Sequence, residues 1–72
     1  MQVKLDDFKT GWFGLEIGLT DEEISMLIAK LAALRENKGH FHARSSFGGQ
    51  GGVGDIEFYW AESSSPEGLV LE

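Results

Sequence analysis

The sequence has no cysteine and only one proline, and basic side chains are few among its 72 residues. The lack of cysteine excludes disulfides and thiolate metal sites, so packing, a partner or an ion held by other ligands must stabilise the fold. No apolar run approaches the roughly 20 residues that a membrane span needs, and the start MQVKLDDFK lacks the apolar stretch of a secretory signal. We therefore expect a cytoplasmic protein without a membrane partner.

The scarcity of basic residues also indicates which classes of partner the chain can bind. Twelve acidic residues stand against 6 basic ones, giving a formal net charge of −6. Such a charge repels the phosphates that dominate nucleic-acid affinity, so we expect no DNA or RNA partner. A basic protein surface would be attracted, although a charge of this size also serves solubility.

The length allows one domain, and we assign residues 1–72 to a single small α+β domain. A domain this short typically buries about 60% of its unfolded surface, so its core must be thin. Neither an internal repeat nor a long low-complexity segment is present.

One amphipathic helix is clearly marked. Thr20 and Glu23 have the spacing of a capping box, in which each side chain bonds the other's backbone amide. Asn37 or Gly39 can adopt the left-handed conformation that ends a helix. We predict the helix over about residues 20–37, with an apolar row formed by Ile24, Leu27, Ile28, Leu31 and Leu34.

Alternating polar and apolar residues predict strands on both sides of the helix. Residues 2–5 and 13–19 alternate with a two-residue period and favour a hairpin. Residues 40–47 and 55–60 predict a second pair of strands joined by the glycine-rich segment 48–54. The expected fold is β-β-α-β-β, a mainly antiparallel sheet of about four strands with the helix packed on one face.

Side-chain polarity predicts the register of the second pair. If Ser46 faces Asp55, Arg44 faces Glu57 and His42 faces Tyr59, all charged residues share one side of the sheet. Arg44 and Glu57 would then form a cross-strand ion pair. A short C-terminal edge strand, residues 69–71, is also consistent with the pattern.

A polar and aromatic face remains opposite the predicted helix. Exposed tryptophan and tyrosine are enriched at protein interfaces, which makes this face the candidate surface for a protein partner or for homodimerisation. The candidate partner-binding residues are Trp12, Glu16, His40, His42, Arg44, Asp55, Glu57 and Tyr59.

The same face admits a metal as an alternative. His40 and His42 are two residues apart on a strand, so both project to one side and could share a divalent ion with Asp55 and Glu57. The histidine pair could also act as a pH-sensitive element, because imidazole titrates near neutrality, but nothing in the sequence selects this reading. We expect no cofactor and no enzyme, because no nucleophile motif is present and the glycine-rich segment leads into a strand instead of a phosphate-binding helix.

The string HFH, followed by a serine pair and GGQGGVGDIEFY, resembles a motif set of small uncharacterised bacterial proteins, some assigned as immunity proteins of polymorphic toxin systems. The resemblance covers about residues 12–60. It implies a non-catalytic protein-interaction module that binds and neutralises a cognate toxin.

Overall fold

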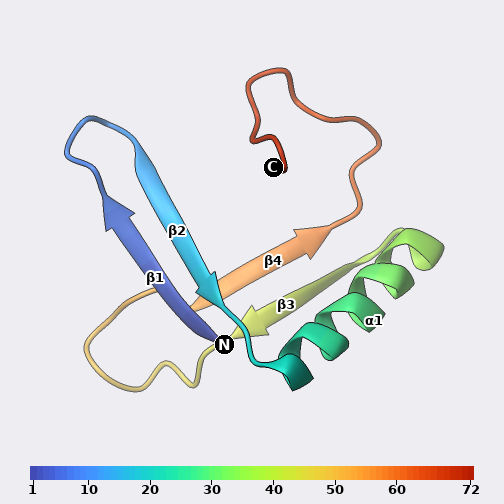
Figure 1. Ribbon diagram of the computed structural model, residues 1–72, viewed down its shortest axis with the longest axis horizontal. Helices are drawn as coiled ribbons and strands as arrows, with labels where there is room; N and C mark the ends of the chain where they lie inside the picture. The colour runs from blue at the N-terminus through green and yellow to red at the C-terminus, as the bar shows by residue number, and fades with distance from the viewer.

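The computed structural model describes all residues, 1–72, and has the element order β-β-α-β-β (Figure 1). This confirms the mixed α+β class and the order predicted from the sequence. The helix is neither long nor apolar enough to cross a membrane. The elements are β1 (Gln2–Asp7), β2 (Phe13–Gly18), α1 (Asp21–Asn37), β3 (His40–Arg44) and β4 (Asp55–Tyr59).

The strands form two separate antiparallel sheets, β1–β2 and β3–β4. The prediction of one sheet is therefore wrong. Each strand bonds only to its neighbour in the sequence, and the helix between the hairpins makes its main strand contact with β3. The C-terminal segment forms no strand either, and Leu69 and Leu71 are fully exposed.

The first hairpin has the predicted alternation. Val3 lies opposite Ile17 and Leu5 opposite Leu15, so one side of the hairpin is apolar. Its turn uses Lys9 in a left-handed conformation, with φ of 61°, and the Lys9 amide donates to Asp7 Oδ1 at 2.8 Å.

The helix begins as predicted. The Glu23 amide donates to Thr20 Oγ1 at 3.2 Å, and the Thr20 amide donates to Glu23 Oε1 at 3.0 Å, which completes the capping box. The helix ends at Asn37, as predicted, but the left-handed conformation that follows it, with φ of 53°, belongs to Lys38 and not to Asn37 or Gly39. The Lys38 ammonium lies 4.9 Å from the centre of the Trp60 ring, a cation–π contact that offsets part of the cost of this conformation.

The second hairpin has the predicted faces but a different register. Arg44 lies opposite Asp55 and His42 opposite Glu57, so the pairing is displaced by two residues from the prediction. Polarity excludes a slip of one residue, which exchanges the two faces, but a slip of two keeps every side chain on its face. In the observed register the Asp55 carboxylate forms hydrogen bonds with both His42 and Arg44.

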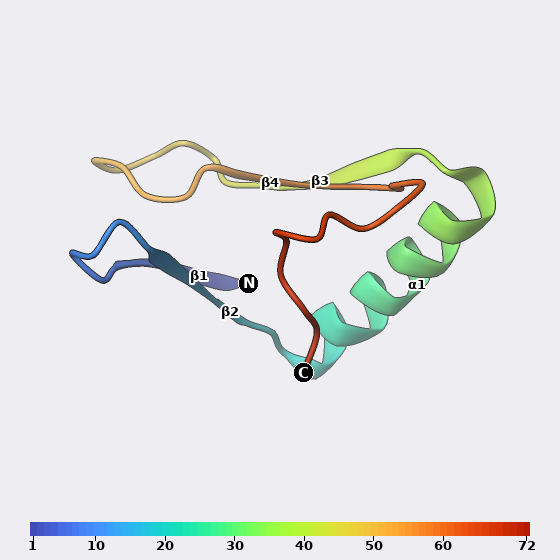
Figure 2. The same ribbon diagram turned by 90° about the horizontal axis from the view of Figure 1, so that it is seen from above.

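The chain lacks a core of its own. No residue is buried, and the radius of gyration is 14.1 Å, whereas a compact domain of this length would have about 11 Å. Figure 2 shows the reason: the two hairpins form separate layers, and α1 joins them at one end. The residues nearest to a core are half-buried and include Leu27, Leu34, Phe41, Ile56 and Phe58.

Candidate functional site

The outer side of β3–β4 gathers six of the eight residues predicted to bind a partner. His40 pairs with Tyr59, His42 with Glu57 and Arg44 with Asp55, at alternate positions of the two strands. Alternate positions share one side of a sheet, so these side chains form one surface. We call it the outer face; it comprises His40, His42, Arg44, Asp55, Glu57 and Tyr59.

Asp55 is the centre of the hydrogen bonding on the outer face. Its Oδ1 lies 3.0 Å from His42 Nδ1 and accepts a hydrogen bond from Arg44 Nε at 3.1 Å. Partial desolvation raises the pKa of Asp55, but the bonds from His42 and Arg44 outweigh it and hold the pKa below its ordinary value. Asp55 therefore acts as an ionised acceptor between two donors.

His40, His42 and Glu57 form a cluster of metal-ligand type. One ligand atom from each lies within 4.8 Å of the other two. The two imidazole rings are 5.3 Å apart, edge to face. Asp55, predicted as a fourth ligand, lies outside this cluster, and its carboxylate pairs with His42 and Arg44.

The other two candidate residues lie on the first hairpin, apart from the outer face. Trp12 precedes β2 and is 75% exposed. Glu16 lies on β2 beside Lys4, with 3.8 Å between Lys4 Nζ and a carboxylate oxygen of Glu16. A hydrogen bond that the protonated Glu16 donates to the Asp6 carboxylate raises the pKa of Glu16, so this residue belongs to a local charge cluster.

A second surface, absent from the sequence predictions, is apolar. Large hydrophobic side chains on the apolar sides of the first hairpin and the helix remain exposed. Ile28 of the helix row is 63% exposed, and Phe13 of β2 is 61% exposed. We call this set the bare apolar surface; it comprises Leu5, Phe13, Leu15, Ile17, Ile24, Ile28 and Leu31.

A signal for this surface was present in the sequence. Three apolar faces, those of two hairpins and one helix, must be covered, and the 17-residue helix can cover only part of them. The pattern shows which side chains avoid water but not which molecule covers them.

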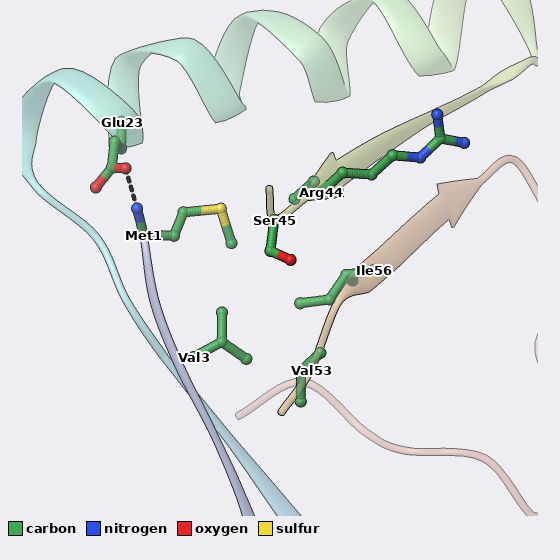
Figure 3. A pocket seen from close by; sticks show the side chains of 8 residues that line it. Met1, Val3, Glu23, Arg44, Ser45, Val53 and Ile56 are labelled. Carbon is green, nitrogen blue, oxygen red and sulfur yellow. Dashed lines mark hydrogen bonds and ion pairs between the residues drawn. The ribbon is translucent and has the colours of Figure 1, made fainter. Parts of the chain in front are cut away.

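An open hollow of about 470 Å³ lies between β1 and the second hairpin (Figure 3). Val3 lines it from β1, and Ile56 and Val53 line it from the opposite layer. Val3 shares its side of β1 with Leu5, so the apolar sides of the two hairpins both turn toward the hollow. Its rim carries an ion pair between the Met1 amine and Glu23.

The arrangement offers two distinct surfaces, one polar and aromatic, the other apolar and uncovered. Comparison with known proteins adds no assignment: no family model, no curated protein and no solved structure matches the chain.

Proposed function

We propose that this chain is a non-catalytic protein-interaction module that completes its fold by associating with a second copy of itself. The observation that carries the proposal is that no residue of the chain is buried. A two-stranded hairpin is marginally stable in water, and this chain consists of two such hairpins and one helix.

The exposed area has the size that an obligate dimer buries. The chain exposes 6682 Å², whereas a folded monomer of 7.9 kDa exposes about 4,400 Å². The excess is about 2,300 Å² per chain, or about 4,600 Å² for two, and obligate homodimers bury about 2,000 to 5,000 Å² in total.

The bare apolar surface, together with the hollow, has the shape that a two-fold interface requires. A two-fold interface uses the same patch on both partners, so the patch must contain a projecting part and a receiving part. Here the helix row with Ile24, Ile28 and Leu31 projects, and the hollow beside Val3 and Ile56 is open. The free edges of both hairpins can accept strands in addition.

The outer face would remain available after this association, because it lies on the opposite side of β3–β4 from Phe41, Ile56 and Phe58. Tyr59 is 67% exposed there and stands at the end of β4, opposite His40. Neutralisation of a bacterial toxin, the function that the HFH and GGQGGVGDIEFY motifs imply, is the most concrete form of the proposal. In this form the outer face is the toxin-binding surface.

Light scattering at several chain concentrations tests the proposal, with circular dichroism reporting the fold. We expect twice the chain mass for the wild type. Ile28→Asp, on the helix row, should lose both the dimer and the folded spectrum. Ala29→Asp adds the same carboxylate on the far side of the helix and should keep both.

A wild-type chain that scatters as a monomer and still unfolds cooperatively would contradict the proposal. Equal behaviour of Ile28→Asp and Ala29→Asp would contradict the assignment of the bare apolar surface as the interface.

A further inference from the structure

We propose that the outer face is a binding site for a divalent transition-metal ion, for which Zn²⁺ is the natural probe, with His40, His42 and Glu57 as ligands. The proposal does not depend on self-association, because its residues lie outside the bare apolar surface. It rests on the position of three ligands and on a fourth residue that orients one of them.

The strand geometry places the three ligands together. His40 and His42 occupy alternate positions of β3, and Glu57 is the cross-strand partner of His42. Their ligand atoms lie within 4.8 Å of one another. Around a tetrahedral zinc ion the ligand atoms are about 3.3 Å apart, given bond lengths near 2.0 Å. Binding therefore requires the three side chains to rotate and bring these atoms closer together.

Asp55 supplies the independent observation. Both of its oxygens lie near His42 Nδ1, at 3.0 and 3.1 Å. A carboxylate in this position accepts the Nδ1 proton, which leaves the Nε2 lone pair free for a metal. Metal-bound histidines commonly have this arrangement, in which the outer carboxylate fixes the tautomer and the direction of the ring.

Arg44 completes the arrangement by holding Asp55 in this role. Its Nε donates to Asp55 Oδ1 at 3.1 Å, on the side of the carboxylate next to the histidine. Arg44 is followed by the loop to β4, and its backbone position opposite Asp55 fixes the pair in register. Asp55 is thus a positioning residue, whereas Glu57 is the carboxylate ligand.

The donor set selects the class of ion. Two imidazoles and one carboxylate suit Zn²⁺ and other first-row transition ions, whereas Ca²⁺ and Mg²⁺ prefer sites made of oxygen ligands. Three protein ligands leave a further coordination position for water or for a group from a bound partner.

Titration calorimetry with Zn²⁺ on the full chain tests the site, and the visible spectrum of bound Co²⁺ reports the ligand geometry. We expect one ion per chain and no competition by Mg²⁺. His40→Gln and His42→Gln should abolish binding, and Glu57→Gln should weaken it at least tenfold.

Asp55→Asn gives the sharpest readout because it leaves all three ligands in place. Loss of an orienting carboxylate typically lowers metal affinity by 10 to 100-fold, so we expect a loss of that size with the Co²⁺ spectrum retained. Glu62→Gln, which removes an acid beyond the end of β4, is the matched control and should bind as the wild type does.

Zinc binding that survives Glu57→Gln and Asp55→Asn unchanged would overturn the proposal and leave an adventitious histidine pair only. Absence of binding to the folded wild type would overturn it as well. Circular dichroism reports whether each variant folds. If a histidine variant unfolds, the zinc affinity of Glu57→Gln tests the site in its place.

Discussion

At the scale of single residues, some contacts join near neighbours in the sequence and others join residues far apart in it. The capping box at Thr20 and Glu23 was predictable because both partners lie within one helical turn. The end of the helix near residue 37 was predicted as well, but the left-handed residue after it was not: it is Lys38, which contacts Trp60, far away in the sequence. The role of Asp55 also depends on a register that places it opposite Arg44.

Lys9 provides a test at this scale, since it holds a left-handed conformation without being glycine. Asparagine adopts this conformation more readily than lysine, whose side chain crowds the following carbonyl. Asparagine is enriched several-fold at positive φ, so we expect Lys9→Asn to stabilise the protein by up to about 1 kcal/mol. Lys9→Val should destabilise it, because β-branched residues disfavour positive φ. Urea unfolding at one fixed chain concentration measures both; a lower stability for Lys9→Asn would contradict the assigned turn.

At the scale of elements, the helix and the four strands follow from local rules. Apolar spacing located α1, and alternation located β1 and β2 near their observed bounds. The same alternation set the two faces of β3–β4 but left the register wrong by two residues, since polarity distinguishes only odd shifts. The division into two sheets was not predictable, because hydrophobic patterns do not specify which strands pair across a helix.

Glu23 links the start of α1 to pH. Hydrogen bonds from the Met1 amine and, second, from the Thr20 amide lower the pKa of Glu23 from 4.5 to about 2, despite some desolvation. A depressed pKa means that the unfolded chain binds the proton more readily, so the stabilisation is present above pH 4.5 and is lost as the pH falls to about 2.

We therefore expect Glu23→Gln to be less stable than the wild type at neutral pH and to approach it near pH 2. Urea midpoints across this range measure the convergence. Glu22→Gln removes the same charge from the same helical turn and is the control. A constant gap between Glu23→Gln and the wild type down to the lowest pH would show that the carboxylate charge contributes nothing.

At the scale of the whole molecule, the sequence predicted the α+β class but not the absence of a core. The apolar rows of α1 and the hairpins show which faces must be buried. The same sequence pattern results whether these faces pack against the same chain or against another one. The radius of gyration of 14.1 Å and the lack of buried residues show that this chain does not cover these rows itself.

Self-association predicts that stability depends on chain concentration. For a folded dimer in equilibrium with unfolded monomers, each tenfold increase in concentration adds about 1.4 kcal/mol to the free energy of unfolding. Urea unfolding at two concentrations, followed by tryptophan fluorescence, measures this shift. A midpoint that stays the same at both concentrations would contradict association with a second copy.

The open hollow between β1 and the second hairpin has a consequence for the amount of folded protein that a given chain concentration yields. If only a second copy fills it, dilution separates the two copies and thereby unfolds them, as a denaturant would. When unfolded chains predominate, the amount of folded dimer rises with the square of the free chain concentration, so doubling that concentration would yield about four times as much folded protein. The level of expression, and not the sequence alone, would then decide whether the fold exists at all.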